Sequence, residues 1–254
     1  MLYNTLNLII TLAVVKCDDT SVTFLSLSQD EGVLFLRVAR TEHTYLDLPE
    51  ALEVKGLSMR PWFLLLINSL VSKEEGRFTL ESCESYTFFE KISIGIRRQS
   101  KKDYIGLLVQ CISSNIMKDV PNQARFDATL QILRRFNSVR RERWARVWLY
   151  SLQLIADLVD GKPYLAPEAE TFLNTNTLFW LKFSDGAICL AKNQTDTQDG
   201  IQIESLVASM ILQCGDPNFE FSNGWNNRKL WENAISVTEN YLTKRFGFYF
   251  GRRR

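Results

Sequence analysis

Histidine, glycine and proline are scarce in this chain of 254 residues, and its cysteines are not grouped in pairs. The single histidine, His43, cannot supply the nitrogen ligands of a typical zinc site, and no two cysteines have the C-x-x-C spacing of such sites. We therefore expect no metal, and we expect the thiols to be buried and reduced, as they are in the cytoplasm or the nucleus. The five cysteines are Cys17, Cys83, Cys111, Cys189 and Cys214.

The sequence also lacks the motifs of common active sites. Neither the phosphate loop G-x-x-x-x-G-K nor the dinucleotide pattern G-x-G-x-x-G occurs. His43 lies in ARTEHTYLD, a stretch typical of a strand or its edge, where a single histidine is more often structural than catalytic. Asp185 and Lys192 have the arrangement of two members of a metal-dependent nuclease site, but the acid between them is missing. The sequence therefore predicts a non-enzymatic protein without catalytic residues or a cofactor.

Two apolar runs raise the question of a membrane or a secretory signal. Leu8 to Val15 has the length of the apolar core of a signal peptide, but no positive charge precedes it, and Lys16 and Cys17 stand where small residues are expected. The second run, Trp62 to Ile67, is too short to cross a bilayer. We expect no membrane span and an intracellular protein.

Residues 1–100 are predicted to form a β-rich lobe with one buried helix. Residues 20–40 contain two alternating stretches around a Gln-Asp-Glu-Gly turn, which predicts a hairpin, and residues 85–98 are rich in strand-forming side chains. The apolar segment 60–74 is expected to be the buried helix, because Ser58 suits a helix cap and Pro61 suits the first turn.

Residues 101–254 are predicted to form a mainly helical lobe. Apolar periodicity and helix-ending residues predict helices over 103–119, 122–136, 139–160, 203–213 and 228–245. Gly161 suits the end of the third helix, and a hairpin is expected within residues 177–192, with its turn at Asp185-Gly186. The fold class is therefore α+β, with the β-rich lobe packed on the helical lobe, either as two lobes or as one compact domain.

Charge is distributed unevenly although the net charge is only +1. Three segments, residues 97–102, 122–148 and 244–254, together carry 16 of the 30 basic residues and only 2 of the 29 acidic ones. The central segment uses arginine alone, which favours planar, two-pronged contacts to phosphate or carboxylate groups. The candidate binding residues there are Arg134, Arg135, Arg140, Arg141, Arg143 and Arg146.

The C-terminal sequence KRFGFYFGRRR resembles a base-stacking strand of RNA-recognition domains only in its aromatic and basic residues, because no helix and strand follow it. We expect Phe246, Phe248 and Tyr249 to anchor the last helix. Arg252, Arg253 and Arg254 then remain as a basic end that assists binding.

Three functions fit these observations, and the third is an enzyme whose site the sequence does not reveal. The first is a structural protein that binds RNA or DNA, of the viral nucleocapsid or matrix kind, in which a helical corner of arginines holds backbone phosphates. Acidic surface elsewhere on such a protein would meet the basic surface of a neighbouring copy and favour self-association. The alternative is a subunit or adaptor of a larger complex, with the arginines paired to acidic surfaces of the same chain or of a protein partner.

Overall fold

The computed structural model describes residues 2–3, 7–17, 21–39, 63–74, 77–89, 104–140, 143–173, 175, 177–191, 199–214 and 227–250. The chain forms two compact units that alternate along the sequence. The sheet unit contains Met1–Ile105 and Val120–Arg140, and the helical unit contains Gly106–Asp119 and Arg141–Arg254. Strands dominate the first unit and helices the second, so the predicted α+β class is confirmed.

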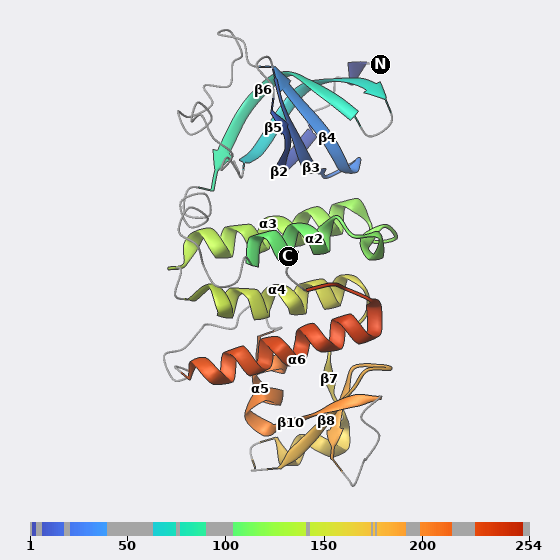
Figure 1. Cartoon of the computed structure of the whole chain (residues 1–254), viewed down its shortest axis with the longest axis vertical. Helices are drawn as coiled ribbons and strands as arrows, with labels where there is room; N and C mark the ends of the chain where they lie inside the picture. Colours follow the sequence, from blue (N-terminus) through green and yellow to red (C-terminus); the bar gives the residue numbers. More distant parts are fainter. Residues whose placement is uncertain are drawn as a thin grey trace. The chain divides into compact units, whose positions relative to one another are not determined.

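A six-stranded sheet forms most of the sheet unit (Figure 1). Its strands are β1 (Leu2–Tyr3), β2 (Asn7–Cys17), β3 (Ser21–Ser28), β4 (Gly32–Ala39), β5 (Phe63–Glu74) and β6 (Arg77–Phe88). Strands β2, β3 and β4 are antiparallel neighbours, β4 pairs in parallel with β6, and β5 pairs with both β6 and β2. Five strands therefore follow one another in a closed ring of pairings, beside which β1 adds to β5.

The predicted first hairpin is confirmed as β3 and β4, which pair from Ser21↔Ala39 to Ser28↔Gly32. Phe24 and Leu36 are buried on one face of this hairpin, as the alternating pattern requires. The apolar run from Leu8 to Val15 forms most of β2, where Ile9 and Ile10 are fully buried.

The predicted buried helix over residues 60–74 is wrong, because residues 63–74 form strand β5. Its backbone pairs with β6 from Phe63↔Phe88 to Glu74↔Arg77, and Leu65 also pairs with Ile9 of β2. An uninterrupted apolar run has no period that separates a helix from a strand, so these distant partners decide its conformation. Only the first part of the predicted strand 85–98 belongs to β6, and residues 90–98 lie outside the described part of the chain.

Helix α3 (Asn122–Ser138) also belongs to the sheet unit and packs against β3 and β4. Pro121 precedes it as the N-cap residue. The side chain of Asn122 donates a hydrogen bond of 2.7 Å to the carbonyl oxygen of Asp30, in the turn between β3 and β4. Gly32 ends that turn with φ +73°, and a side chain on Gly32 would meet the Asn122 amide. The start of α3 is therefore fixed on the hairpin turn.

In the helical unit, α4 (Trp144–Leu158) and α6 (Arg228–Phe246) lie side by side (Figure 1). Arg146 near the start of α4 contacts Trp231 near the start of α6, and Tyr241 hydrogen-bonds to Gly161 beyond the end of α4. The two helices therefore run in the same direction. The other helices that the structure describes are α2 (Tyr104–Ile112), whose first two residues belong to the sheet unit, the short 3-10 turns η2 (Asn115–Met117) and η4 (Pro167–Phe172), and α5 (Ser205–Gln213).

The helices differ from their predicted bounds at three places. The helix predicted over 103–119 ends at Ile112, where the hydroxyl groups of Ser113 and Ser114 donate to helix carbonyls. The predicted break at residues 137–138 is wrong, because α3 continues through Ser138 and α4 begins only at Trp144. Residues 203–204 belong to a strand, so α5 begins two residues later than predicted.

The residue that takes the left-handed conformation after α4 also differs from the prediction. Asp160, and not Gly161, takes the left-handed conformation, with φ 52°. The Gly161 amide donates to the carbonyl of Ala156 and so closes the helix end. Gly161 is needed for space instead, since a side chain there would collide with the ring of Phe246.

A four-stranded sheet of order β10-β8-β9-β7 completes the helical unit. Its strands are β7 (Tyr164–Leu165), β8 (Leu178–Lys182), β9 (Ala187–Leu190) and β10 (Gly200–Glu204). The predicted hairpin is confirmed as β8 and β9. Gly186 has φ +83° in its turn, and the Asp185 carboxylate accepts a hydrogen bond of 2.9 Å from the Ala187 amide.

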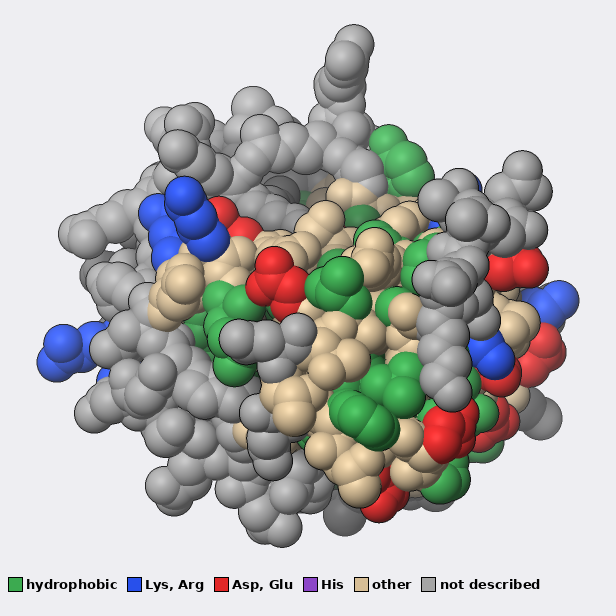
Figure 2. Space-filling view, turned by 90° about the horizontal axis from the view of Figure 1, so that it is seen from below, with side chains coloured by type: hydrophobic (Ala, Val, Ile, Leu, Met, Phe, Trp, Pro, Cys, Tyr) green, Lys and Arg blue, Asp and Glu red, His purple; other side chains and the backbone are tan. Residues whose placement is uncertain are grey.

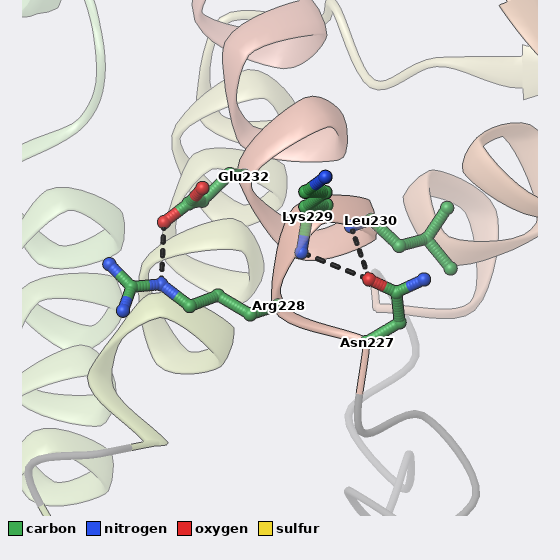
Figure 3. A network of polar contacts seen from close by, with 5 residues as sticks. All are labelled: Asn227, Arg228, Lys229, Leu230 and Glu232. Carbon is green, nitrogen blue, oxygen red and sulfur yellow. Dashed lines mark hydrogen bonds and ion pairs between the residues drawn. The ribbon is translucent and has the colours of Figure 1, made fainter.

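Helix α6 begins with a capped first turn (Figure 3). The Asn227 side chain accepts hydrogen bonds from the amides of Lys229 and Leu230, and Arg228 pairs with Glu232 one turn further on at 2.8 Å. Gly247, at φ 80°, ends the helix in the left-handed conformation. Among the helices that the structure describes, none combines the length and the apolar character needed to cross a bilayer.

Candidate nucleic-acid interface

The C-terminal half of α3 carries the first pair of predicted arginines. Arg134 is exposed and Arg135 half-buried, because α3 buries the opposite face through Ile132, Leu133 and Phe136. The two arginines lie beside a shallow surface hollow of about 490 Å³. The hollow is lined by Asp127, Leu130, Gln131, Arg134, Arg135 and Ser138. These positions recur every three or four residues, so they form one stripe along the helix.

Three of the predicted arginines are exposed and have no counter-ion among the residues that the structure describes. Arg134, Arg140 and Arg143 are exposed. Within the part of the chain that the structure describes, none of the three takes part in an ion pair or a hydrogen bond through its side chain. Pairing with acids of the same chain, one of the two explanations open from the sequence, therefore does not account for these three arginines among the described residues.

The start of α4 concentrates positive charge further. Arg143 is its N-cap, the first turn contains no acid, and the Arg143 side chain makes no capping hydrogen bond. A helix N-terminus already carries partial positive charge, so basic residues there are unfavourable for the free helix and an anion beside them is favourable. Burial, and next the charge of Arg143, lower the pKa of Arg146. The two guanidinium groups therefore repel each other.

Arg146 is held in place by an aromatic ring. Its guanidinium carbon lies 5.2 Å from the centre of the Trp231 ring on α6, the distance of a cation–π contact. Arg146 is half-buried in this position. It thus differs from Arg143, which lies exposed at the helix start.

The structure places the predicted arginines in both units. Arg134, Arg135 and Arg140 belong to the sheet unit, and Arg143 and Arg146 belong to the helical unit. Chain geometry alone keeps Arg140 and Arg143 close, since three residue steps span at most about 11 Å. That all of them form one corner stays a prediction. Arg141, Arg252, Arg253 and Arg254 lie outside the described residues.

The aromatic end of the chain packs partly as predicted. Phe248 is buried, and its ring centre lies 6.5 Å from that of Phe246, which also contacts Tyr241. The prediction for Tyr249 is wrong, because its side chain is 57% exposed. Phe250 takes the anchoring place instead, with its ring centre 6.3 Å from that of Trp148 on α4. An extended chain alternates its side chains, so Phe248 and Phe250 share a side that Tyr249 does not.

The described thiols are buried, as predicted. These are Cys111, Cys189 and Cys214. Burial, with a smaller contribution from the nearby Glu239 carboxylate, raises the pKa of Cys111 to about 12, so this thiol is not a nucleophile at neutral pH. Among the described residues, no group of three histidine, cysteine or acidic side chains is placed to hold a metal.

The hollow on α3 is the feature that the sequence did not reveal. Leu130, the apolar residue in its lining, is spaced along α3 like the other buried residues and is not distinguished from them by the sequence. Gln131 and Ser138 belong to no sequence motif that indicates a binding site. Only the spacing of Asp127, Arg134 and Ser138 on one helical face gives a hint, and such a stripe usually means a solvated surface. No protein-family model matches the chain, and no curated protein is measurably similar to it.

Proposed function

We propose that this protein is a non-enzymatic structural protein that binds the phosphate backbone of RNA or DNA through the arginines at the end of α3 and the start of α4. The observation that supports the proposal is the exposure of Arg134, Arg140 and Arg143 without an acidic partner among the described residues. The described residues between positions 134 and 143 thus present three exposed guanidinium groups without a described acidic partner, and a polyanion is the ligand that such a segment suits.

The residue type supports phosphate as the group that is bound. A guanidinium donates two parallel hydrogen bonds to one phosphate and is less strongly hydrated than an ammonium group. The amides at the start of α4 are donors as well, and they lie beside Arg143, which does not cap them, in a first turn without an acid. Contacts of this sort bind the backbone and do not read the base sequence.

A salt-dependent titration tests the proposal. Fluorescent single-stranded RNA and DNA oligomers are titrated with the wild type and with Arg134→Gln/Arg140→Gln/Arg143→Gln at several salt concentrations. Each lost phosphate contact reduces the slope of log affinity against log salt by about 0.7 on a single strand, so we expect a slope smaller by about 2 and affinity lower by about tenfold or more. The substituted side chains are exposed, so the fold is retained.

The matched control removes three positive charges elsewhere. Lys118, Lys162 and Lys229 are exposed, and Lys118→Gln/Lys162→Gln/Lys229→Gln changes the net charge by the same amount. We expect this control to bind almost as the wild type does. Absence of wild-type binding at low salt, or an equal loss in both triple variants, would overturn the proposal. A separate Arg252→Gln/Arg253→Gln/Arg254→Gln variant measures the contribution of the C-terminal arginines.

A further inference from the structure

One end of the small sheet of the helical unit, where β8 begins and β10 ends, carries exposed leucines beside a carboxylate. Residues 164–214 carry six acidic and two basic side chains. Leu178 begins β8 and is 47% exposed, and Leu206, at the start of α5, is 58% exposed. The exposed Glu204 is the direct partner of Leu178 in the antiparallel pair of β8 and β10, so both side chains point to the same face.

Phe172 extends this surface. Its side chain is 40% exposed at the end of η4. The hydroxyl of Thr175 donates to the Phe172 carbonyl and lies 2.6 Å from the Thr177 hydroxyl, which brings the end of η4 next to the first residue of β8. The exposed Glu170 lies on the same short turn. We call the surface of Phe172, Leu178, Leu206, Glu170 and Glu204 the acidic knob.

Figure 2 views the helical unit from the side of β8 and β10, and it shows hydrophobic side chains interspersed with acidic ones. Most apolar surface on a protein occurs as single side chains and needs no explanation. Here Leu178 is exposed at the start of β8, opposite the carboxylate of Glu204, and Leu206 is exposed at the start of α5. This combination suits a partner that offers an apolar recess bordered by positive charge.

The same chain carries such a recess. The hollow on α3 has Leu130 in its lining and is bordered by Arg134 and Arg135. We infer that the acidic knob of one molecule docks in the α3 hollow of a second copy, with Leu206 or Leu178 against Leu130 and Glu204 opposite Arg134. The inference uses arginines that the proposed function also uses, and it needs no nucleic acid.

The geometry of the contact predicts the form of assembly. The knob and the hollow are different surfaces, so each docked molecule still presents one free knob and one free hollow. Association of this kind is open-ended and adds copies head to tail. The contact is small and partly ionic, so we expect weak association that salt suppresses.

Two variants separate the two surfaces without removing an arginine. Leu178→Glu/Leu206→Glu removes both leucines of the knob, and a carboxylate in the first turn of α5 is compatible with the helix dipole. Ser138→Trp fills the hollow from an exposed position at the end of α3. Val15→Glu/Phe35→Glu is the matched control, since it places two carboxylates at exposed apolar positions of the sheet unit.

Sedimentation velocity over a wide range of protein concentration gives the result. We expect the wild type and the control to sediment faster as concentration rises at low salt, and each variant alone to lose this dependence. An equal mixture of the two variants should form a dimer and nothing larger, because it combines one intact knob with one intact hollow. A wild type that stays monomeric, or variants that associate as the wild type does, would overturn the inference. Binding of the fluorescent RNA and DNA is measured on the same variants. A failure of the docking inference is therefore distinguishable from a failure of the proposed nucleic-acid binding.

Discussion

Single residues show how the helical unit is held together at one end. The hydroxyl of Tyr241, a fully buried residue of α6, donates a hydrogen bond of 2.7 Å to the carbonyl of Gly161 beyond α4. It also accepts one of 2.6 Å from Arg245. A buried hydroxyl thus connects α6 to the end of its neighbour, and burial raises the pKa of Tyr241, which keeps the donor protonated.

Removal of this hydroxyl should be costly for its size. We expect Tyr241→Phe to lower the free energy of unfolding by about 1–3 kcal/mol, because the buried Gly161 carbonyl and the Arg245 guanidinium each lose a partner. Urea denaturation measures the change, and Tyr249→Phe is the control because Tyr249 is exposed. Equal stability of the two variants would show that water replaces the lost hydrogen bonds.

The elements differ in how far the sequence determines them. The hairpins β3–β4 and β8–β9 are encoded by alternation and by a turn at Gly32 or Gly186, so both could be predicted. Strand β5 could not be predicted, because its apolar run fits a helix equally well. Its partner β2 is distant along the chain, and its other partner, β6, follows it in a further antiparallel pair.

The site was predictable in composition and not in arrangement. The arginine-rich segment is evident from the sequence, and so is the exposure of Arg134, which lies off the apolar face of α3. The division of these arginines between two units is not evident from the sequence. It arises because α3 joins the sheet unit through contacts with residues about ninety positions earlier. Neither the stacking of Arg146 on Trp231 nor the hollow beside Leu130 has a local sequence signal.

The attachment of α3 to the hairpin can be tested as an element. Gly32→Ala places a methyl group 2.5 Å from the Asn122 side-chain oxygen and forces alanine into φ +73°, so we expect a loss of about 2–4 kcal/mol in unfolding free energy. Asn122→Ala alone removes the hydrogen bond to Asp30 and should cost about 1 kcal/mol. The double variant Gly32→Ala/Asn122→Ala should be more stable than the sum of the two losses implies, because the new methyl group no longer collides with the Asn122 side chain. Strict additivity in the double-mutant cycle would argue against this contact.

At the scale of the whole molecule, the charge distribution is the dominant feature. Three segments hold more than half of the basic residues and almost none of the acids, so the remaining chain is strongly acidic although the net charge is +1. On the two proposals above, polyanions bind the basic segments, and the acidic knob of a second copy binds beside Arg134, which is one of the same arginines. The two proposed partners of Arg134, a phosphate and the Glu204 carboxylate of a second copy, are both anions and exclude each other.

Mutual exclusion leads to a prediction about assembly. We expect an oligonucleotide just long enough to cover one molecule to dissociate head-to-tail assemblies, because phosphates occupy the arginines beside the hollow. Linkage requires the reverse effect as well, so Leu178→Glu/Leu206→Glu should bind that oligonucleotide more tightly than the wild type does at concentrations where the wild type is assembled. Sedimentation velocity with a labelled oligonucleotide measures both effects, and an uncharged peptide nucleic acid of the same length is the control. Assemblies that grow when the short oligonucleotide is added would instead mean that phosphates and the acidic knob bind to separate arginines.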